Sequence, residues 1–265
     1  MKKRTGLLLA CTLLAVLLLS GCSGQKRAEY RADVQSGVSY LQSLETIDPD
    51  TVTQKLRQMR LEKLQAERAA REQALLDDID TVWQEFSDAV ILGDSRAVGF
   101  SYYSFLDASR VLASSGERID AIDGHIEDLK KLDPAYIFLC YGINDLGWYG
   151  SAQDYADTLL EKIRLLRREL PEVVADLKEA LPGVTVVVSS ILPAYEPAVS
   201  REKLWLQIPD YTAAVQAMCE ENGVLFADNT QLSEDYADLW QPDGIHLLPE
   251  FYPHWAANLI FASWG

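Results

Sequence analysis

A serine stands at the end of an apolar run in the segment ILGDSRAVGF, residues 91–100. A serine hydroxyl is a weak nucleophile at neutral pH and reacts only when a neighbouring base takes its proton. Ser95 therefore either caps the helix expected after it or serves as a nucleophile. The second interpretation requires three further parts: a base, a group that orients the base, and donors for a developing negative charge.

A base and its partner lie near the C-terminus, where the segment PDGIH places Asp243 three residues before His246. An isolated imidazole titrates at about pH 6.5, so His246 can accept the serine's proton, and Asp243 can hold the ring and stabilise its charged form. The spacing is weak by itself, because His246 can equally be an ordinary surface histidine.

Hydrogen-bond donors for an oxyanion are available after two further apolar runs. Gly116 follows the second run, in SSGER, and Asn144 follows the third, in YGIND. The backbone N–H groups of Ser95 and Gly116 and the side-chain amide of Asn144 can supply three donors for the tetrahedral intermediate of acyl transfer. Gly116 and Gly142 can also be plain turn residues.

The elements that position these groups alternate along the chain. Short apolar runs predict strands at 89–92, 111–115, 136–141, 184–192 and 224–228, and helices are expected at 120–132, 152–181 with a break near Pro171, 203–222 and 249–264. Such alternation predicts a parallel sheet with helices on both faces. Functional groups of open sheets gather at the carboxyl ends of strands, and this placement favours Ser95 as a nucleophile.

Together these segments resemble the SGNH, or GDSL-type, hydrolases from about Ala89 to the C-terminus. The four blocks of that family correspond to GDS at 93–95, Gly116, GIND at 142–145 and DGIH at 243–246. The resemblance implies a three-layer αβα sandwich whose flavodoxin-like, five-stranded parallel sheet has the order 2-1-3-4-5. It implies a serine esterase that needs no metal or other cofactor.

The resemblance also assigns roles to individual residues. It implies Ser95 as nucleophile, His246 as base, Asp243 as its partner, and Ser95, Gly116 and Asn144 as the oxyanion hole. The helix expected after Ser95 would add the positive end of its dipole. We expect Asp94, Gly142 and Asp145 to support the site rather than react. Arg96 replaces the leucine that is common after the family's serine, which weakens an inference towards a lipase.

The N-terminus predicts export and anchoring. MKKR precedes an apolar core at residues 6–19, and LSGC at 19–22 resembles the lipobox of bacterial lipoproteins, in which the cysteine receives a diacylglyceryl group. We therefore expect an extracytoplasmic protein anchored through a lipid on Cys22. The predicted parts are a signal peptide at 1–21, a tether at 22–50, a helical stalk at 51–87 and a hydrolase domain at 88–265.

Charge restricts the partners of the domain. Twelve basic and twelve acidic residues precede Asp88, whereas twelve basic and twenty-eight acidic residues follow from there, which gives the whole net charge of −16. A domain with this much negative charge repels phosphate backbones, so we expect no nucleic-acid partner. The sequence leaves open the oligomeric state and whether Cys140 and Cys219 pair.

Aromatic residues near the expected loops either bind a carbohydrate substrate, because flat rings suit sugar faces, or pack the bodies of the loops. The candidates are Trp148, Tyr149, Tyr195, Trp205 and Trp240. We expect the enzyme to remove small O-acyl groups, above all acetyl, from a glycan or another acylated small molecule. A lipase, lysophospholipase or thioesterase, an O-acyltransferase, and a non-catalytic surface-binding lipoprotein remain alternatives.

Overall fold

The computed structural model of the chain describes residues 30–40, 49–170 and 184–264. The chain divides into two compact units at Arg68 and Ala69. The predicted signal peptide, Cys22 and Pro171 lie outside the described residues. Within the described ranges, no helix has both the length and the apolar character needed to cross a membrane.

The first unit is helical wherever it is described. Residues 30–40, which we expected to be part of a tether, form an exposed helix. Helix α2, Pro49–Asp77, continues past the boundary between the units. It has no glycine, and it is rich in Leu, Gln, Glu, Arg and Ala, which favour helices.

The end of the expected stalk belongs to the core of the second unit. Helix α2 ends at Asp77, and a 3-10 turn η1, Ile79–Thr81, and a short helix α3, Val82–Glu85, follow it. Val82 and Phe86 are buried in one of the two cores. The helix expected to run through Phe86 is therefore interrupted after Asp77, and the turn that follows leads these side chains into the core.

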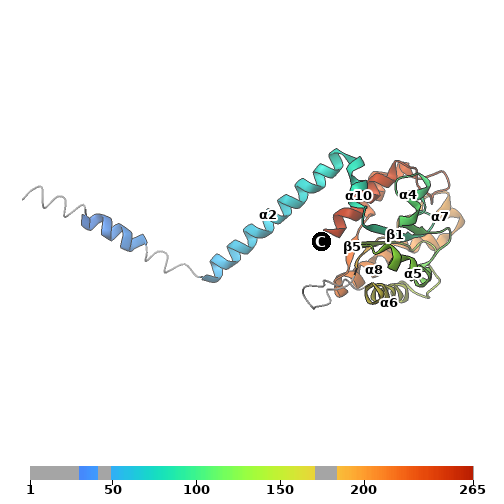
Figure 1. Ribbon diagram of the computed structural model, residues 1–265, viewed down its shortest axis with the longest axis horizontal. Helices are drawn as coiled ribbons and strands as arrows, with labels where there is room; N and C mark the ends of the chain where they lie inside the picture. The colour runs from blue at the N-terminus through green and yellow to red at the C-terminus, as the bar shows by residue number, and fades with distance from the viewer. Residues whose placement is uncertain (1–29, 41–48, 171–183, 265) are drawn as a thin grey trace, which may run out of the picture. The chain divides into compact units, whose positions relative to one another are not determined.

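A five-stranded parallel sheet forms the centre of the second unit (Figure 1). The order of its strands is β2-β1-β3-β4-β5. Its strands are β1 Ala89–Gly93, β2 Val111–Ala113, β3 Tyr136–Cys140, β4 Thr185–Ser189 and β5 Leu225–Ala227. Gly93, the last residue of β1, pairs with Ala113 and Cys140. The order and the five strand positions confirm the sequence prediction.

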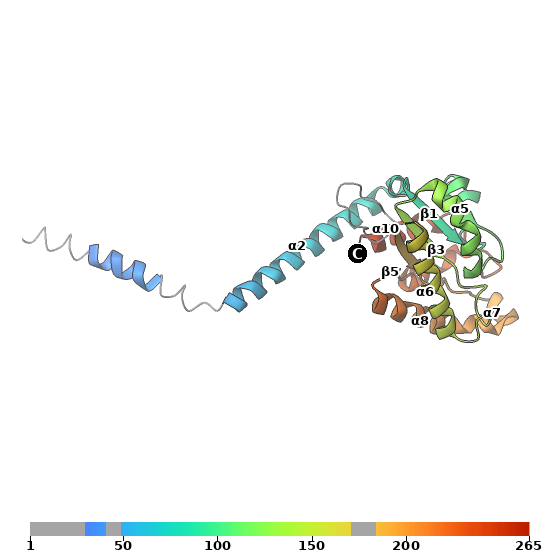
Figure 2. The same ribbon diagram turned by 60° about the horizontal axis from the view of Figure 1, so that its bottom comes forward.

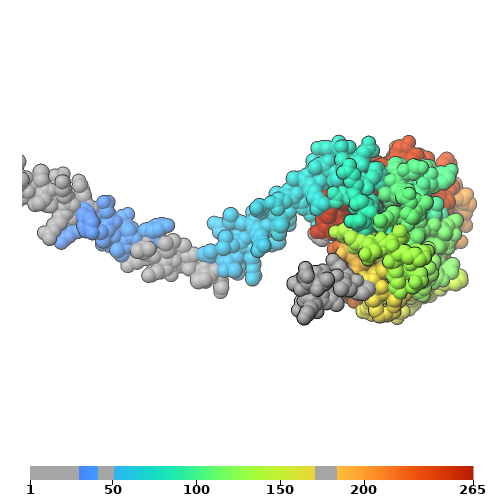
Figure 3. Space-filling model, viewed as in Figure 1, coloured from blue at the N-terminus to red at the C-terminus, as the bar shows by residue number. Residues whose placement is uncertain are grey.

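Helices cover both faces of the sheet and complete the three-layer sandwich (Figures 1 and 2). One core contains residues of α5, Ile122–Leu132, α6, Ala152–Glu169, and α8, Ile208–Asn222. The other contains residues of α3, of α4, Gly99–Tyr102, and of α10, Phe251–Ser263. On the surface, α5 and α6 lie side by side (Figure 3). Lys162 of α6 pairs with Asp123 of α5 at 2.7 Å.

Short elements connect the layers. They are η2 Ala108–Arg110, η3 Ile119–Ala121, α7 Ala198–Arg201, η4 Lys203–Gln207, α9 Thr230–Asp235 and η5 Ala237–Leu239. The sequence pattern merged two of them, η3 and η4, with the longer helices that follow. Cys140 and Cys219 are buried free thiols, so the structure answers the question of their pairing.

Candidate active site

Ser95 lies two residues beyond the end of β1, in a turn, and its side chain is half-buried. It does not cap a helix: α4 begins only at Gly99, and its N-cap residue is Val98. The expectation that a helix dipole acts at Ser95 was therefore wrong, because α4 has only four residues and starts beyond the serine. What fixes the turn is Asp94, whose Oδ1 accepts the backbone N–H of Arg96 at 2.9 Å.

The histidine and aspartate predicted from PDGIH meet the serine in one hydrogen-bonded chain. His246 Nε2 lies 3.1 Å from Ser95 Oγ, and His246 Nδ1 lies 2.6 Å from Asp243 Oδ2. When the Asp243 carboxylate accepts the Nδ1 proton, the lone pair of Nε2 faces the serine hydroxyl. This is the arrangement that removes a proton from serine.

The protein backbone holds Asp243 in its ionised form. Its Oδ1 accepts the N–H groups of Ile245 at 2.8 Å and His246 at 3.0 Å. Partial burial raises the pKa of Asp243, but the hydrogen bonds from the His246 ring and these two amides outweigh it, so the pKa lies below its ordinary value. Arg201 donates to the Asp243 carbonyl oxygen at 2.9 Å and ties down the same turn.

The residues expected to donate to an oxyanion follow β2 and β3, the two neighbours of β1. Asn144 Nδ2 donates to the Glu117 carbonyl oxygen at 3.0 Å, which links the loop after β3 to the loop after β2. Because an amide nitrogen carries two hydrogens, this bond orients Asn144 and leaves its second donor for another acceptor. Gly116 has φ +80°, a conformation that favours glycine.

Gly142 is required by space as well as by conformation. Its φ is +131°, and a Cβ there would collide with the side chain of Ile191. A larger residue would have to displace Ile191 or the GIND loop. We expected Gly142 to support the site, and the structure requires glycine at this position.

A buried ion pair lies behind the serine. Arg96 Nη2 is 3.4 Å from Asp94 Oδ2, and both side chains are almost fully buried. Arg96 Nη1 also donates to the Leu192 carbonyl oxygen at 2.7 Å, and Tyr252 donates to the Arg96 carbonyl oxygen at 2.8 Å. The sequence indicated Arg96 only as a departure from the family's pattern, whereas the structure gives it a role in linking the serine turn to the segment after β4.

Asp145 is fully buried and makes a structural bond. Its Oδ1 accepts the Ile119 N–H at 3.0 Å, so it joins the GIND loop to the chain that follows Gly116. Burial raises the pKa of Asp145 to about 7. Its Oδ2 has no hydrogen-bond partner among the described residues, which matches a carboxyl group that is costly to ionise.

The aromatic residues expected to bind sugar fall into two groups. Four are packed inside or against the domain: Tyr149, Tyr195, Trp205 and Trp240. Trp148 is 62% exposed, but the Arg118 guanidinium lies 3.9 Å from its ring centroid and covers one face. Sequence reasoning missed Tyr102 and Tyr103, although they follow the serine turn directly, in SYYSF.

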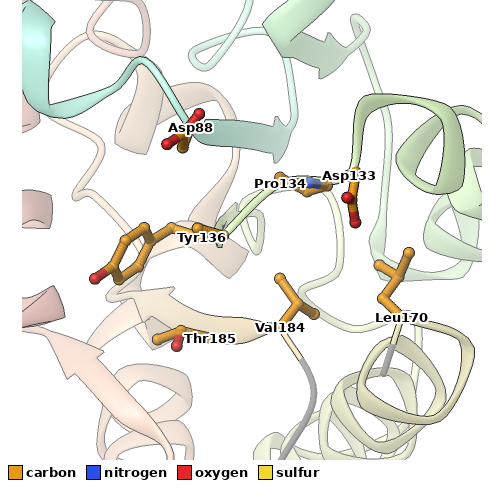
Figure 4. A pocket seen from close by; sticks show the side chains of 8 residues that line it. Asp88, Asp133, Pro134, Tyr136, Leu170, Val184 and Thr185 are labelled. Atoms are coloured by element: carbon orange, nitrogen blue, oxygen red, sulfur yellow. The ribbon is translucent and has the colours of Figure 1, made fainter. Parts of the chain in front are cut away.

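A pocket of about 340 Å³ lies beside Ser95. Its wall consists of Ser95, Val98, Gly99, Tyr102, Tyr103, Gln241, His246, Leu247 and Tyr252. A larger pocket of about 460 Å³ lies at the opposite edge of the sheet, where Asp88, Tyr136 and Thr185 stand at the amino ends of β1, β3 and β4 (Figure 4). Groups that act on ligands gather at the carboxyl edge of such sheets, so the pocket beside Ser95 is the candidate substrate site.

Comparisons with known proteins identify similar solved structures. A GDSL-like lipase from Bacteroides thetaiotaomicron shares the fold with a TM-score of 0.50 and 19% identity, over 65% of this chain and 84% of that chain. Axe2, an acetylxylan esterase from Geobacillus stearothermophilus, gives a TM-score of 0.47 and 15% identity, over 66% and 93% of the two chains. No curated protein matches the sequence.

Family membership follows from the sequence itself. The sequence profile described as GDSL-like Lipase/Acylhydrolase family matches residues 91–252, more than half of the chain. This stretch contains all four blocks on which we based the resemblance. The chain belongs to the GDSL-like lipase/acylhydrolase family and is a serine ester hydrolase.

Proposed function

We propose that this protein is an extracytoplasmic esterase, anchored by a lipid on Cys22, that removes small O-acyl groups, above all acetyl, from carbohydrate. The observation that carries the catalytic part is the hydrogen-bonded chain from Asp243 through His246 to Ser95. The anchor rests on the LSGC sequence at 19–22.

In the first half of the reaction, His246 Nε2 takes the proton of Ser95 as Oγ attacks the ester carbonyl. The carbonyl oxygen becomes an oxyanion, which the N–H groups of Ser95 and Gly116 and the amide of Asn144 stabilise. Asp243 stabilises the imidazolium that forms. The tetrahedral intermediate collapses when His246 returns its proton to the alcohol oxygen, so the alcohol leaves and an acyl group remains on Ser95.

In the second half, water takes the place of the alcohol. His246 accepts a proton from the water as its oxygen attacks the acyl-enzyme, and the same donors stabilise the second oxyanion. Collapse of this intermediate breaks the bond to Ser95 Oγ, which recovers its proton from His246. The products are the carboxylic acid and the free enzyme.

Two features support a sugar ester as substrate. The pocket beside Ser95 combines tyrosine rings with the polar side chain of Gln241, as hydroxylated ligands require. The second unit also offers little apolar surface for a lipid: among its described residues, the large apolar side chains that are exposed are Leu76, Tyr102, Trp148 and Leu206.

The test measures hydrolysis of nitrophenyl esters of increasing chain length, followed by acetate release from acetylated oligosaccharides. It uses soluble protein that starts after Cys22, with Ser95→Ala as the matched control. We expect turnover that prefers acetyl and is abolished by the substitution. Activity that rises with chain length would indicate a lipase or thioesterase. Transfer of the acyl group to an added sugar would indicate an acyltransferase, and absence of turnover would indicate a binding protein.

A further inference from the structure

We propose that the pocket beside Ser95 holds the alcohol part of the ester, a single neutral sugar ring, with Tyr102 and Gln241 as its contacts. This inference rests on the proposed function, which leaves open where the two parts of the ester lie. It assigns one of them to named side chains.

The direction of proton transfer decides which part of the ester the pocket holds. In the tetrahedral intermediate, the oxyanion turns towards its donors, two of which stand on the loops with Gly116 and Asn144. The leaving oxygen must receive its proton from His246 Nε2, so the alcohol lies on the histidine side of Ser95. The pocket of about 340 Å³ is bordered by both Ser95 and His246, and it therefore lies on the alcohol side.

The floor of this pocket is a set of fixed polar groups. Gln241 Nε2 donates to Tyr103 Oη at 3.2 Å and to the Leu247 carbonyl oxygen at 3.1 Å. Tyr103 Oη donates to the same carbonyl oxygen at 3.3 Å. These bonds use the amide nitrogen of Gln241, and among the described residues nothing donates to its Oε1. That oxygen is a fixed acceptor for a sugar hydroxyl.

The rim of the pocket is an aromatic side chain in water. Tyr102 is 77% exposed, the highest exposure among the large apolar side chains described. Its ring meets that of Tyr103 edge to face at 5.0 Å, and Tyr103 in turn lies 5.4 Å from the buried Tyr252. An anchored tyrosine thus supports an exposed one directly beside the nucleophile, as a site for the apolar C–H face of a sugar requires.

Charge narrows the class of sugar. The pocket wall contains no arginine, lysine, aspartate or glutamate, and His246 is its one titratable nitrogen base. A sugar carboxylate or phosphate would find no cation there, and the net charge of the chain, −16, would repel it. A neutral, hydroxylated alcohol fits both observations.

The decisive variant is Tyr102→Ala, with Leu206→Ala as the matched control. Both side chains are large and exposed, and neither is buried in the core. Substrates are methyl acetate and the mono-O-acetyl and mono-O-butyryl esters of methyl β-glucopyranoside. We expect Tyr102→Ala to lower kcat/KM for both sugar esters about tenfold, and to leave methyl acetate and the deacylation rate unchanged, because the sugar has left before that step. Leu206→Ala should leave all three substrates unchanged, and Trp148→Ala, at a second exposed aromatic side chain, is measured beside them.

Two kinetic outcomes would overturn this assignment. A change in the ratio between acetyl and butyryl esters in Tyr102→Ala would place the acyl chain in the pocket. Loss of sugar-ester activity in Trp148→Ala, with Tyr102→Ala unaffected, would place the sugar on the opposite side of Ser95.

A binding measurement separates failure of this assignment from failure of the proposed function. Methyl β-glucopyranoside itself is titrated into Ser95→Ala while NMR follows the saccharide signals. We expect binding that Tyr102→Ala, added to Ser95→Ala, weakens several-fold. Binding of this kind without any hydrolysis by the wild type would contradict the esterase function and support the sugar pocket. Hydrolysis without such binding would support the esterase function and contradict the sugar pocket.

Discussion

At the scale of single residues, Asp243 determines how the rate depends on pH. Its lowered pKa keeps the carboxylate charged on the acid side of the profile, so a fall in rate there reports loss of the free base at Nε2 and not loss of this charge. We expect kcat/KM to fall with a slope of one as the pH decreases. A rate that stays constant down to pH values near the ordinary aspartate pKa would contradict His246 as the base.

The substitution Asp243→Asn tests the same carboxylate directly. Without the negative charge the imidazolium loses its partner, and an amide at that position favours the wrong tautomer of the ring. We expect kcat to fall by roughly 10³–10⁴-fold. The far-ultraviolet circular dichroism spectrum serves as the folding control. An unchanged kcat would contradict the role of Asp243 as the partner of His246.

Asp145 should make the stability of the fold depend on pH. Its pKa in the folded chain, about 7, lies above the ordinary value of 3.8. A raised pKa means that the folded state holds the proton more tightly, so the stabilising contribution is complete below pH 3.8 and is lost as the pH rises through 7. Relative to Asp145→Asn, which cannot ionise, the wild type should lose about 4 kcal/mol over that window.

Urea unfolding at several pH values measures this difference. The amide of Asp145→Asn keeps an oxygen for the Ile119 N–H, so the variant should fold. Asp157→Asn, at an exposed position on α6, is the matched control and should follow the wild type. Parallel stability curves for Asp145→Asn and the wild type would show that Asp145 does not carry a raised pKa.

At the scale of elements, the sequence predicted the parts that periodicity encodes. Buried strands appear as continuous apolar runs, and the alternation with helices indicates a parallel sheet, so all five strands were predictable. The position of the Ser95 turn was predictable, but its conformation was not. Residue types do not show whether the next helix begins directly after the serine or four residues later. Two partners of Arg96, Leu192 and Tyr252, lie far away in the chain. So does Ile119, the partner of Asp145, and no local pattern reveals such contacts.

The boundary of the hydrolase domain belongs to this scale as well. Residues before Asp88 supply Leu75, Val82 and Phe86 to the core, and Trp83 stacks on Phe105 with ring centroids 4.8 Å apart. A chain that begins at Asp88 therefore leaves a cavity beside α10. We expect its melting temperature to lie roughly 10 °C or more below that of a chain beginning at Ala69.

Differential scanning calorimetry of the two truncated proteins, with the protein that starts after Cys22 as reference, measures this contribution. The chain beginning at Ala69 should melt with the reference, since the second compact unit starts there. Equal melting temperatures for all three would mean that residues 69–87 are dispensable for folding.

At the scale of the whole molecule, the proposed anchor determines where the acidic hydrolase domain works. Lipid on Cys22 would hold the enzyme at a membrane surface, whereas an uncleaved apolar segment at 6–19 could do so without any lipid.

Protein from cells should therefore partition into detergent, and protein produced without residues 1–22 should stay in the aqueous phase. The variant Cys22→Ser distinguishes the two anchors. If the anchor is a lipid, mass spectrometry should find the diacylglyceryl group on the N-terminal peptide of the wild type and not on that of the variant. A wild-type N-terminal peptide that carries no lipid mass would contradict the anchor, while the chemistry at Ser95 would remain untouched, because no step of the reaction involves the N-terminal segment.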